Sequence, residues 1–232
     1  MHELEEYCKM KLYYESALKV LEAQLEIIKN ELSIIGKESP INYTKTRIKS
    51  PSSILEKMHR KNIDFSVKNM EKLNDIVGAR IVCNFLDDVF NVVNTIKKDN
   101  NLKIINEKDF IENPKPSGYR GYHIIVSIPI TIYGLTKNVN AEIQIRTTAM
   151  DFWASNEHKL NYKSDKSSEK AKKQLLTTAE SLWDMDVTMN DIYKENKTKE
   201  DHINVIKQIN IISEIAKRKR IEYNSFGEEY EN

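Results

Sequence analysis

Residues 138–147 read NVNAEIQIRT, a run in which apolar and polar residues alternate with a period of two. This alternation is typical of a β-strand, because successive side chains of a strand point to opposite faces of the sheet. The isoleucines would lie on one face, and Glu142, Gln144 and Arg146 on the other. Three such polar groups on an internal strand need partners, which either a buried salt-bridge network or a ligand site would supply.

Upstream of this strand, three runs rich in β-branched residues indicate three more strands. They are IVGARIVCNF (76–85), LKIINEKDFI (102–111) and YHIIVSIPI (122–130). We expect helices over residues 51–62, with Ser52 as a candidate N-cap, and over residues 89–98.

Both ends of the chain are predicted to be helical. Residues 4–35 contain neither Pro nor Gly, and apolar residues run from Leu18 to Ile35 at spacings of three and four. We expect this helix to pack on the domain body, with a coiled-coil contact between subunits as the alternative. Further helices are expected over residues 149–163, 168–193 and 200–222. Strands in the middle and helices at both ends predict an α+β protein.

Composition limits the class of protein. The 232 residues are 40% hydrophobic and 31% charged, with a net charge of +1, so bulk charge does not indicate a general nucleic-acid or membrane binder. Two cysteines, Cys8 and Cys83, argue against a disulfide framework or a cysteine-rich metal site. The charged N-terminus and the absence of a long apolar run predict a cytoplasmic protein.

The pattern Arg47-x-Lys49-x-x-x-Ser53-x-x-x-Lys57 places cations before and inside the first turns of a predicted helix. Helix N-termini favour anions, and Lys and Arg add charge-assisted hydrogen bonds, so a polyphosphate would suit this segment. A solvated basic helix face would give the same pattern.

Two other segments combine residues that a simple fold does not require. Asp75 precedes a strand, where it could hold a metal or simply form a turn, and Arg80 within that strand could pair with a phosphate or stack on a base. The loop KPSGYRGYH (115–123) holds two cations, a His and two aromatic rings. This mixture suits a nucleotide, although a surface hairpin with a Tyr lid is the alternative.

Together, RxKxxxSxxxK, DIxGxRI, SGYRxYH and ExQIRT resemble the synthetase domain of the RelA/SpoT-like family, specifically its small alarmone synthetases of the RelQ type. The resemblance covers roughly residues 40–163. It implies a nucleotidyltransferase-like fold with a central mixed β-sheet of about four to five strands flanked by helices. It also implies a GTP pyrophosphokinase, which transfers pyrophosphate from ATP to the 3′-hydroxyl of GTP, GDP or GMP and releases AMP.

The resemblance implies roles for the residues that match. In the ATP site, Arg47 and Arg80 would sandwich the adenine, and Lys49, Ser53 and Lys57 would bind the phosphates. Asp75 and Glu142 would coordinate Mg²⁺, with Glu142 as the candidate general base.

In the acceptor site, Tyr119 would stack on guanine, Lys115 and His123 would lie near the phosphates, and Gln144 would orient the ribose or base. Arg146 has two possible roles, as a residue of the site or as an anchor of the strand, and neither is assigned to it.

Three departures from the family pattern matter. Asp151 stands where relatives commonly carry Asn, and it could accept hydrogen bonds from the guanine edge. Gly121 replaces a usual Ser, which could loosen the loop. Glu22 and Glu26 replace basic residues that are linked to allosteric alarmone binding, so we expect this regulation to be weakened or absent.

We expect an N-terminal helix (1–36), a synthetase domain (37–165), C-terminal helices (166–223) and a disordered tail (224–232). A homotetramer is implied only by the resemblance. No histidine lies in a His-Asp motif, so no hydrolase domain is expected. The basic run 217–220 is more typical of a solvated helix end than of an RNA contact.

Two other functions stay open at this point. One is a nucleotidyltransferase of related fold that releases pyrophosphate, and the other is a catalytically silent nucleotide- or RNA-binding module. The presence of both Asp75 and Glu142 favours an enzyme, because a sensor does not need the metal pair.

Overall fold

A computed structural model of the protein describes residues 2–35, 39–162 and 168–228, with side chains described over 5–34, 39–160 and 168–198. The elements are, in chain order, α1 (His2–Ile35), β1 (Ile41–Ile48), α2 (Pro51–Arg60), α3 (Val67–Met70), β2 (Val77–Cys83), α4 (Leu86–Lys98), β3 (Lys103–Asp109), β4 (Tyr122–Ile132), β5 (Leu135–Thr147), α5 (Thr148–Tyr162) and α6 (Glu169–Glu228).

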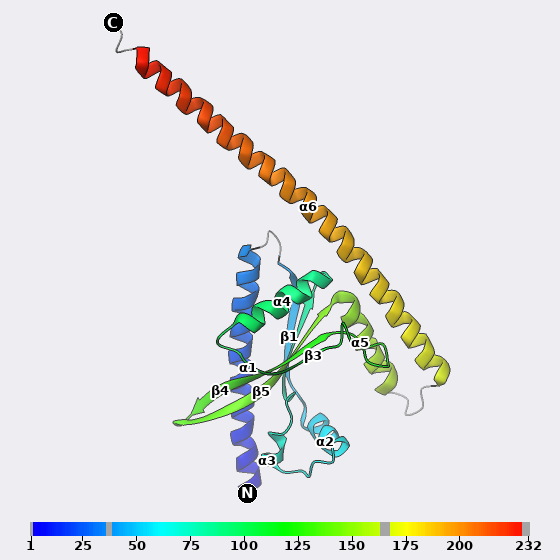
Figure 1. Cartoon of the computed structure of the whole chain (residues 1–232). Coiled ribbons are helices and arrows are strands. Elements are labelled where there is room, and N and C mark those ends of the chain that lie inside the picture. The colour runs from blue at the N-terminus through cyan, green and yellow to red at the C-terminus, as the bar shows by residue number, and fades with distance from the viewer. Residues whose placement is uncertain (1, 36–38, 163–167, 229–232) are drawn as a thin grey trace. The chain divides into compact units, whose positions relative to one another are not determined.

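The five strands form one mixed sheet in the order β1-β2-β5-β4-β3 (Figure 1). β2 and β5 are parallel, and the other neighbouring pairs are antiparallel. The predicted α+β fold with a mixed sheet of four to five strands is therefore confirmed.

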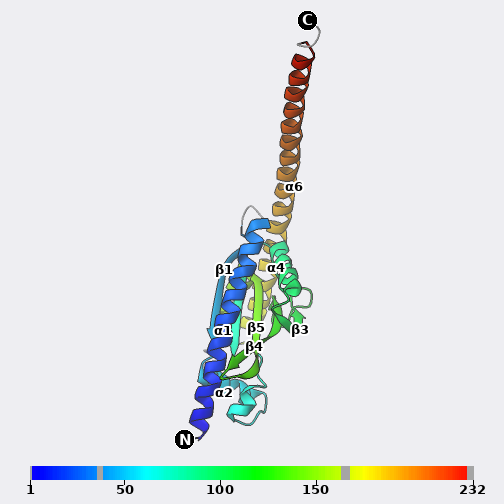
Figure 2. The same ribbon diagram turned by 90° about the vertical axis from the view of Figure 1, so that its left-hand side faces the viewer.

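One face of the sheet is apolar and is covered by α1 and α4 (Figure 2). Leu21, Leu25 and Ile28 of α1 pack into this core with strand residues such as Ile81 and Ile143. Burial of each such side chain contributes roughly 1.5–3 kcal/mol. From Leu18 to Leu32, the apolar stripe of α1 thus packs within the chain, as first expected, and is not free for a coiled-coil contact.

The opposite face of the sheet, which we call the polar face, carries α5 and the first turns of α6. Asp151 of α5 contacts Arg80 and Arg146 of the strands. At the end of β5, on the side of the isoleucines, Thr147 donates to Asp186 of α6 with an oxygen–oxygen distance of 2.5 Å. A small second core of Tyr119, Trp153, Ala154 and Ala179 lies here, and it fixes α5 and α6 against the loop before β4.

Besides the short helix α3, which was not predicted, three features differ from the sequence-based expectations. Residues 41–48 form an edge strand that was not predicted, because INYTKTRI lacks an apolar face and buries only Ile41. The N-cap of α2 is Ser50 rather than Ser52, since Pro51 fits the first helical position without needing an N–H partner.

The third difference lies at the C-terminal end, where the two helices predicted there are one. α6 runs without interruption from Glu169 to Glu228, because residues 194–199 contain no Pro or Gly to end it. It continues into the expected tail as far as Glu228, and residues 229–232 lie outside the described part. The side chains of the basic run 217–220 also lie outside it.

The chain divides into two compact units, Met1–Val187 and Thr188–Asn232. The first contains the sheet and all of the site described below, and the second is helical over its described residues. The finer boundaries at residues 36, 165 and 223 stay predictions. Among the described helices, none combines the length and apolar character that a membrane span requires.

Candidate active site

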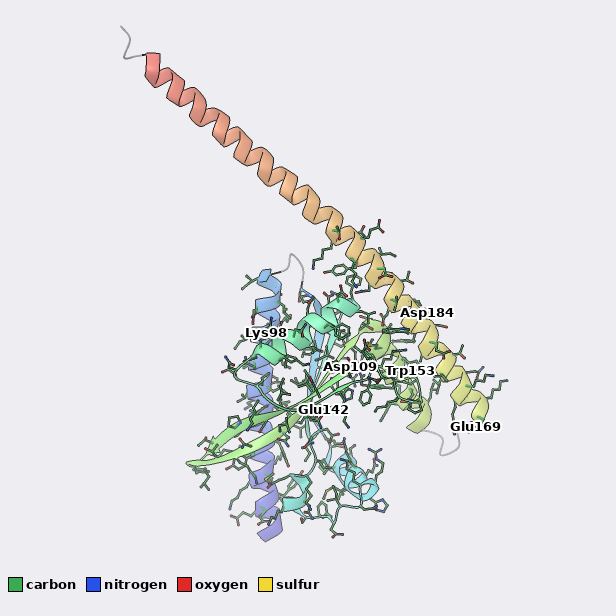
Figure 3. The ribbon with its side chains drawn as sticks, viewed as in Figure 1. Lys98, Asp109, Glu142, Trp153, Glu169 and Asp184 are labelled. Atoms are coloured by element: carbon green, nitrogen blue, oxygen red, sulfur yellow. The ribbon has the colours of Figure 1, made fainter. Side chains whose placement is uncertain are left out.

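Polar side chains of neighbouring strands form two adjoining rows on the polar face. Arg80 of β2 lies beside Gln144 of β5, which lies beside His123 of β4. One step along β5, Glu142 lies beside Gly78, whose other neighbour is Arg47 of β1. Glu142 is near the centre of the sheet (Figure 3). The register therefore gathers predicted residues from four strands.

Asp75 lies just before β2 and is held by two ammonium groups. Its Oδ2 is 2.7 Å from Lys49 Nζ and 2.5 Å from Lys57 Nζ. Its Oδ1 is buried and has no hydrogen-bond partner within the described residues. Burial would raise the pKa of Asp75, but the two lysines outweigh it, so the pKa is lowered. One oxygen is thus left for a further ligand.

Glu142 and four neighbours form a closed set of hydrogen bonds, which we call the hydrogen-bond ring. The five members in order are Glu142, His123, Tyr119, Arg146 and Gln144. The successive distances between donor and acceptor atoms are 3.3, 2.5, 2.8, 2.8 and 2.7 Å. The ring orients both carboxylate oxygens.

The ring also fixes where its protons lie. Arg146 donates to the Tyr119 hydroxyl through two nitrogens, so that hydroxyl donates its own proton to His123 Nε2. His123 Nδ1 then carries the hydrogen that faces Glu142. Burial would raise the pKa of Glu142, but His123 and Gln144 outweigh it and the pKa is lowered, although the nearby charge of Asp75 opposes this. The carboxylate is therefore ionised at neutral pH.

The residues expected around ATP lie together at one edge of the sheet. Arg47 is exposed, and its charge helps to lower the pKa of Arg80, after the larger effects of burial and Arg146. Ser53 is in the first turn of α2, where its N–H donates to Ser50 Oγ at 3.3 Å. Lys57 lies one turn further along α2, on the same side as Asp75.

The loop before β4 places Tyr119 differently from an open stacking platform. Tyr119 is 9% exposed, and the Lys115 ammonium lies 4.7 Å from the ring centroids of both Tyr119 and Phe110. A base could stack on Tyr119 only after Lys115 had moved. Burial lowers the pKa of Lys115.

Gly121 holds this loop close to the sheet. Its φ is +151°, and a Cβ there would lie 3.2 Å from both Arg146 Cγ and the Tyr119 hydroxyl. A serine at this position would be strained and crowded. The glycine therefore permits a close approach of the loop to Arg146, and the expectation that it loosens the loop stays a prediction.

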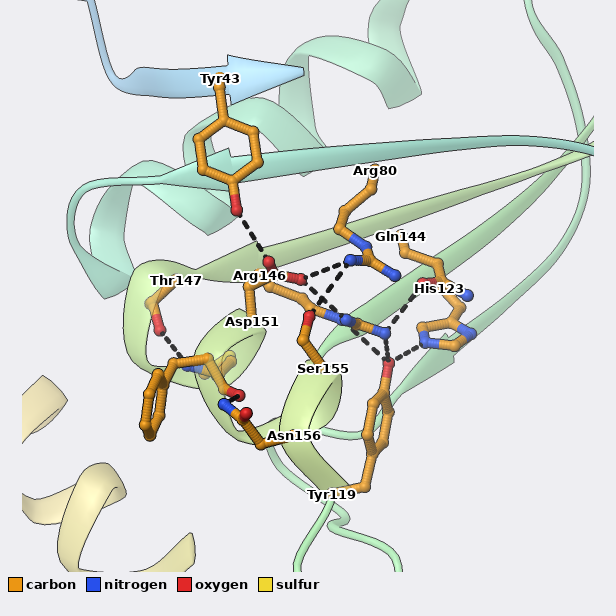
Figure 4. A network of polar contacts seen from close by, with 12 residues as sticks. Tyr43, Arg80, Tyr119, His123, Gln144, Arg146, Thr147, Asp151, Ser155 and Asn156 are labelled. Carbon is orange, nitrogen blue, oxygen red and sulfur yellow. Dashed lines mark hydrogen bonds and ion pairs between the residues drawn. The ribbon is translucent and has the colours of Figure 1, made fainter. Parts of the chain in front are cut away.

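Sequence reasoning left Arg146 unassigned and missed Tyr43 and Ser155. Arg146 is 4% exposed. It donates to Asp151 Oδ1 at 3.0 Å, in addition to its contacts within the hydrogen-bond ring (Figure 4). Tyr43 donates to Asp151 Oδ2 at 2.7 Å, and Arg80 NH1 lies 3.0 Å from Asp151 Oδ1 and 3.5 Å from Ser155 Oγ. The spacing of Tyr43 and Arg47 along β1 would have placed Tyr43 on the site face, had the strand been predicted.

Paired carboxylates surrounded by ammonium and guanidinium groups have the chemistry of a site for phosphorylated ligands. The family model described as "Region found in RelA / SpoT proteins" matches residues 46–167. The chain therefore belongs to the RelA/SpoT family.

Relatives of similar length narrow this assignment. The GTP pyrophosphokinase YwaC of Bacillus subtilis (strain 168) is 45% identical over 161 residues, which cover 69% of this chain and 77% of the relative. The GTP pyrophosphokinase YjbM of the same strain is 38% identical over 183 residues, 78% of this chain and 86% of the relative. Small alarmone synthetase 1 from Bacillus subtilis, in a crystal structure with its product pppGpp, superposes with a TM-score of 0.73 at 37% identity, covering 78% of this chain and 93% of that one.

Glu22 and Glu26 lie on the exposed side of α1. Glu22 accepts a hydrogen bond from Thr46 of β1, on the side of the sheet away from Glu142. The loss of allosteric alarmone binding that these residues suggest stays a prediction.

Proposed function

We propose that the protein is a GTP pyrophosphokinase that transfers pyrophosphate from ATP to the 3′-hydroxyl of a guanine nucleotide and releases AMP. The observation that carries this proposal is the pair of carboxylates on the polar face: Asp75, whose buried Oδ1 has no hydrogen-bond partner among the described residues, and Glu142, which lies beside Gly78 of β2. The pKa of each is lowered, and the charge of Asp75 opposes the lowering at Glu142. The relatives YwaC and YjbM, both GTP pyrophosphokinases, support the same activity for this chain.

The donor half of the site comprises Arg47, Lys49, Ser53, Lys57, Asp75 and Arg80. We assign ATP to this half, with Arg47 and Arg80 at the adenine. Lys49 and Lys57 are 16% and 21% exposed and now contact Asp75, so they can turn to a polyphosphate without crossing a large distance. Flexible ammonium groups with several donors suit such an exchange of partners.

Asp75 and Glu142 fit a divalent cation, which we assign as Mg²⁺. The unpartnered Oδ1 of Asp75 is a buried acceptor, and carboxylate oxygens are ligands that Mg²⁺ prefers. Mg²⁺ is commonly held by one or two carboxylates together with substrate phosphates, which matches this small donor set. When bound, the ion supplies neutralisation of charge on the phosphate oxygens and makes a nearby hydroxyl easier to deprotonate.

Glu142 is the general base in this proposal. The ring holds its carboxylate ionised and oriented, so it can accept the proton of the 3′-hydroxyl. The 3′-oxygen then forms a bond to the β-phosphorus of ATP. The bond from that phosphorus to the α–β bridging oxygen breaks, and AMP leaves with that oxygen. Most of the rate enhancement comes from positioning and charge neutralisation.

The acceptor half of the site comprises Lys115, Tyr119, His123, Glu142, Gln144 and Arg146. We assign the guanine nucleotide to it, with the base on Tyr119 and the phosphates near Lys115 and His123. Movement of Lys115 away from the rings of Tyr119 and Phe110 would open the base site and bring the ammonium to the phosphates.

We also propose a cytoplasmic homo-oligomer, with the tetramer taken from the family resemblance. Since the buried stripe of α1 is used inside the chain, an interface through α1 would need its other side. Exposed apolar residues there include Val20, Ile27 and Ile34 at intervals of seven. An RNA contact has no support among the described side chains.

The test uses purified protein, Mg²⁺ and γ-labelled ATP with GTP, GDP or GMP in separate reactions. Label should move to a guanine nucleotide, with one AMP formed per transfer, and chelation of the metal should stop the reaction. As a matched pair, 2′-deoxy-GDP should accept label and 3′-deoxy-GDP should not. Transfer to 3′-deoxy-GDP, or no transfer to any acceptor, would contradict the proposal.

A further inference from the structure

We infer that Asp151 is a positioning residue that holds Arg80 for ATP, in place of the guanine contact that its sequence position suggests. The inference rests on the proposed function for the identity of the ligand beside Arg80. Its basis is the set of contacts that Asp151 makes with β1, β2 and β5 (Figure 4).

Both oxygens of Asp151 are already in use. Oδ1 lies 3.0 Å from Arg80 NH1 and 3.0 Å from Arg146 NH1, and Oδ2 accepts from the Tyr43 hydroxyl at 2.7 Å. The residue is 6% exposed. These donors fill three of the roughly four acceptor sites of a carboxylate. A guanine edge that donates twice would have to displace at least one of them, and a buried donor without a partner costs roughly 1–3 kcal/mol.

The charge of Asp151 lies between two guanidinium groups that repel each other. Burial lowers the pKa of Arg80, and the charge of Arg146 lowers it further, whereas Asp151 raises it. One carboxylate therefore offsets the repulsion of two cations. An Asn would keep an oxygen and nearly the same shape, but it would leave both positive charges uncompensated.

The two arginines depend on Asp151 to different degrees. Arg146 also donates to Gln144 Oε1 and to the Tyr119 hydroxyl, and its guanidinium lies 5.1 Å from the Tyr119 ring centroid. Arg80 has one other side-chain hydrogen bond among the described residues, to Ser155 Oγ at 3.5 Å. Removal of the Asp151 carboxylate should therefore displace Arg80, while the other members of the hydrogen-bond ring hold Arg146 in place.

Because of this asymmetry, two measurements distinguish the possible roles of Asp151: the KM for ATP and the preference between acceptor nucleotides. If Asp151 acts through Arg80, its loss appears in the KM for ATP and leaves the acceptor little changed. If Asp151 reads the base, its loss appears in the choice of acceptor. Asn offers one acceptor and one donor where Asp offers two acceptors, so a base-reading Asp151→Asn variant would shift preference from guanine toward xanthine.

The experiment compares wild type, Asp151→Asn, Arg80→Ala and the double variant with GDP and xanthosine diphosphate as acceptors. Asp151→Asn should raise the KM for ATP about tenfold, because a charge-assisted hydrogen bond is lost. The preference for GDP over the xanthine nucleotide should stay within about threefold of wild type. In the Arg80→Ala background, Asp151→Asn should change the KM for ATP by less than about twofold, because coupled residues are not additive.

Tyr43→Phe is the second variant, because it removes one donor to Asp151 from a partly exposed side chain and leaves the carboxylate in place. It should raise the KM for ATP about threefold, as expected for one lost hydrogen bond. Thermal unfolding of each variant checks that it is folded.

Two results would overturn the proposal. One is a tenfold or larger shift toward the xanthine nucleotide with the KM for ATP unchanged. The other is an equal effect of Asp151→Asn with and without Arg80. If the wild-type protein transfers no pyrophosphate, the proposed function is contradicted, but the inference about Asp151 and Arg80 can still be tested. The coupling between Asp151 and Arg80 is then measured as the affinity for a non-hydrolysable ATP analogue by calorimetry, with the same expected ratios.

Discussion

Asp75 in the donor half and Glu142 in the acceptor half are both carboxylates with lowered pKa values, yet they are held in different ways. Asp75 takes two lysine ammonium groups on one oxygen, while its other oxygen is buried without a partner among the described residues. Both oxygens of Glu142 are engaged inside the hydrogen-bond ring. The donor half is thus held by flexible cations, and the acceptor half by a fixed network.

The different contacts of Asp75 and Glu142 indicate how each half of the site should respond when a ligand binds. The lysines can exchange Asp75 for phosphate oxygens, so the donor half changes its partners when ATP binds. The ring instead presents Glu142 in one orientation before any ligand arrives, which is preorganisation of a base. Damage to the donor half should therefore appear mainly in the KM for ATP, and damage to the ring in kcat and in stability.

The largest effect should come from Glu142→Gln. The amide cannot accept the 3′-hydroxyl proton, so kcat should fall by about 10³-fold, within the range for general-base catalysis. The KM for ATP should rise by much less than kcat falls, because the cations assigned to ATP lie in the donor half and Glu142 would reach the phosphates only through the metal that it shares with Asp75. Steady-state kinetics measure both, with Glu180→Gln on the exposed side of α6 as the control. Retention of wild-type kcat would remove Glu142 from its role as the base.

In the donor half, Lys57→Met should raise the KM for ATP by roughly 10- to 100-fold, the value of a lost charge-assisted contact. The KM for GDP should stay within about twofold, because Lys57 pairs with Asp75 in the donor half and is assigned to ATP alone. Lys72→Met, an exposed lysine, is the matched control. If the two KM values rise together, the division of the site into halves is wrong.

A substitution within the hydrogen-bond ring should distinguish the two halves further, because it should lower the stability of the protein as well as its activity. Tyr119→Phe keeps the aromatic ring but removes the hydroxyl that accepts from Arg146 and contacts His123. The free energy of unfolding should fall by about 1–3 kcal/mol, because buried donors of Arg146 lose their acceptor. Urea denaturation measures this change. Lys57→Met should leave the denaturation midpoint nearly unchanged. An equal loss of unfolding free energy in the two variants would show that the two halves do not differ in this way.

The smallest expected effect concerns the support of the acceptor half by α6. Asp186 accepts from Thr147 at the end of β5, and burial raises its pKa to about 6 from an ordinary value of 3.8. Its folded pKa lies above the unfolded value, so the stability that its protonation contributes is full below pH 3.8 and is lost as pH rises through about 6. At neutral pH the buried charge is therefore unfavourable.

Asp186→Asn keeps an acceptor for Thr147 and removes this charge. The variant should be more stable than wild type by about 1–2 kcal/mol at pH 7, after discounting for partial exposure. The difference should shrink as pH falls toward 4, and denaturant titrations at pH 4, 5.5 and 7 measure it. A difference that does not depend on pH would show that Asp186 does not titrate in this range.

The fold and much of the site could be predicted because their signals are local. Alternation in NVNAEIQIRT placed Glu142, Gln144 and Arg146 on one face, and the structure confirms this. β1 could not be predicted, because an edge strand facing α1 on one side and a charged site on the other has no apolar periodicity. The contact of Tyr43 with Asp151 was equally hidden, since it joins residues 108 positions apart on an unpredicted strand and a helix.

The roles of Arg146 and Lys115 were hidden for a related reason. Residue type alone does not tell whether a cation faces a ligand or a neighbouring side chain. The structure shows Arg146 closing the ring and Lys115 over two aromatic rings. Both depend on how the loop before β4 meets β5, which no local pattern in the sequence encodes.

The central claim is that ATP is attacked at its β-phosphorus, and the fate of two labels tests it most directly. Wild-type protein is incubated with GDP, Mg²⁺ and ATP labelled at the α-phosphate in one reaction and at the γ-phosphate in another. The account predicts that the α-label is recovered in AMP and the γ-label in the guanine nucleotide, and that neither moves with Glu142→Gln. Recovery of the α-label in the guanine nucleotide, with the γ-label in free pyrophosphate, would show nucleotidyl transfer and contradict the account.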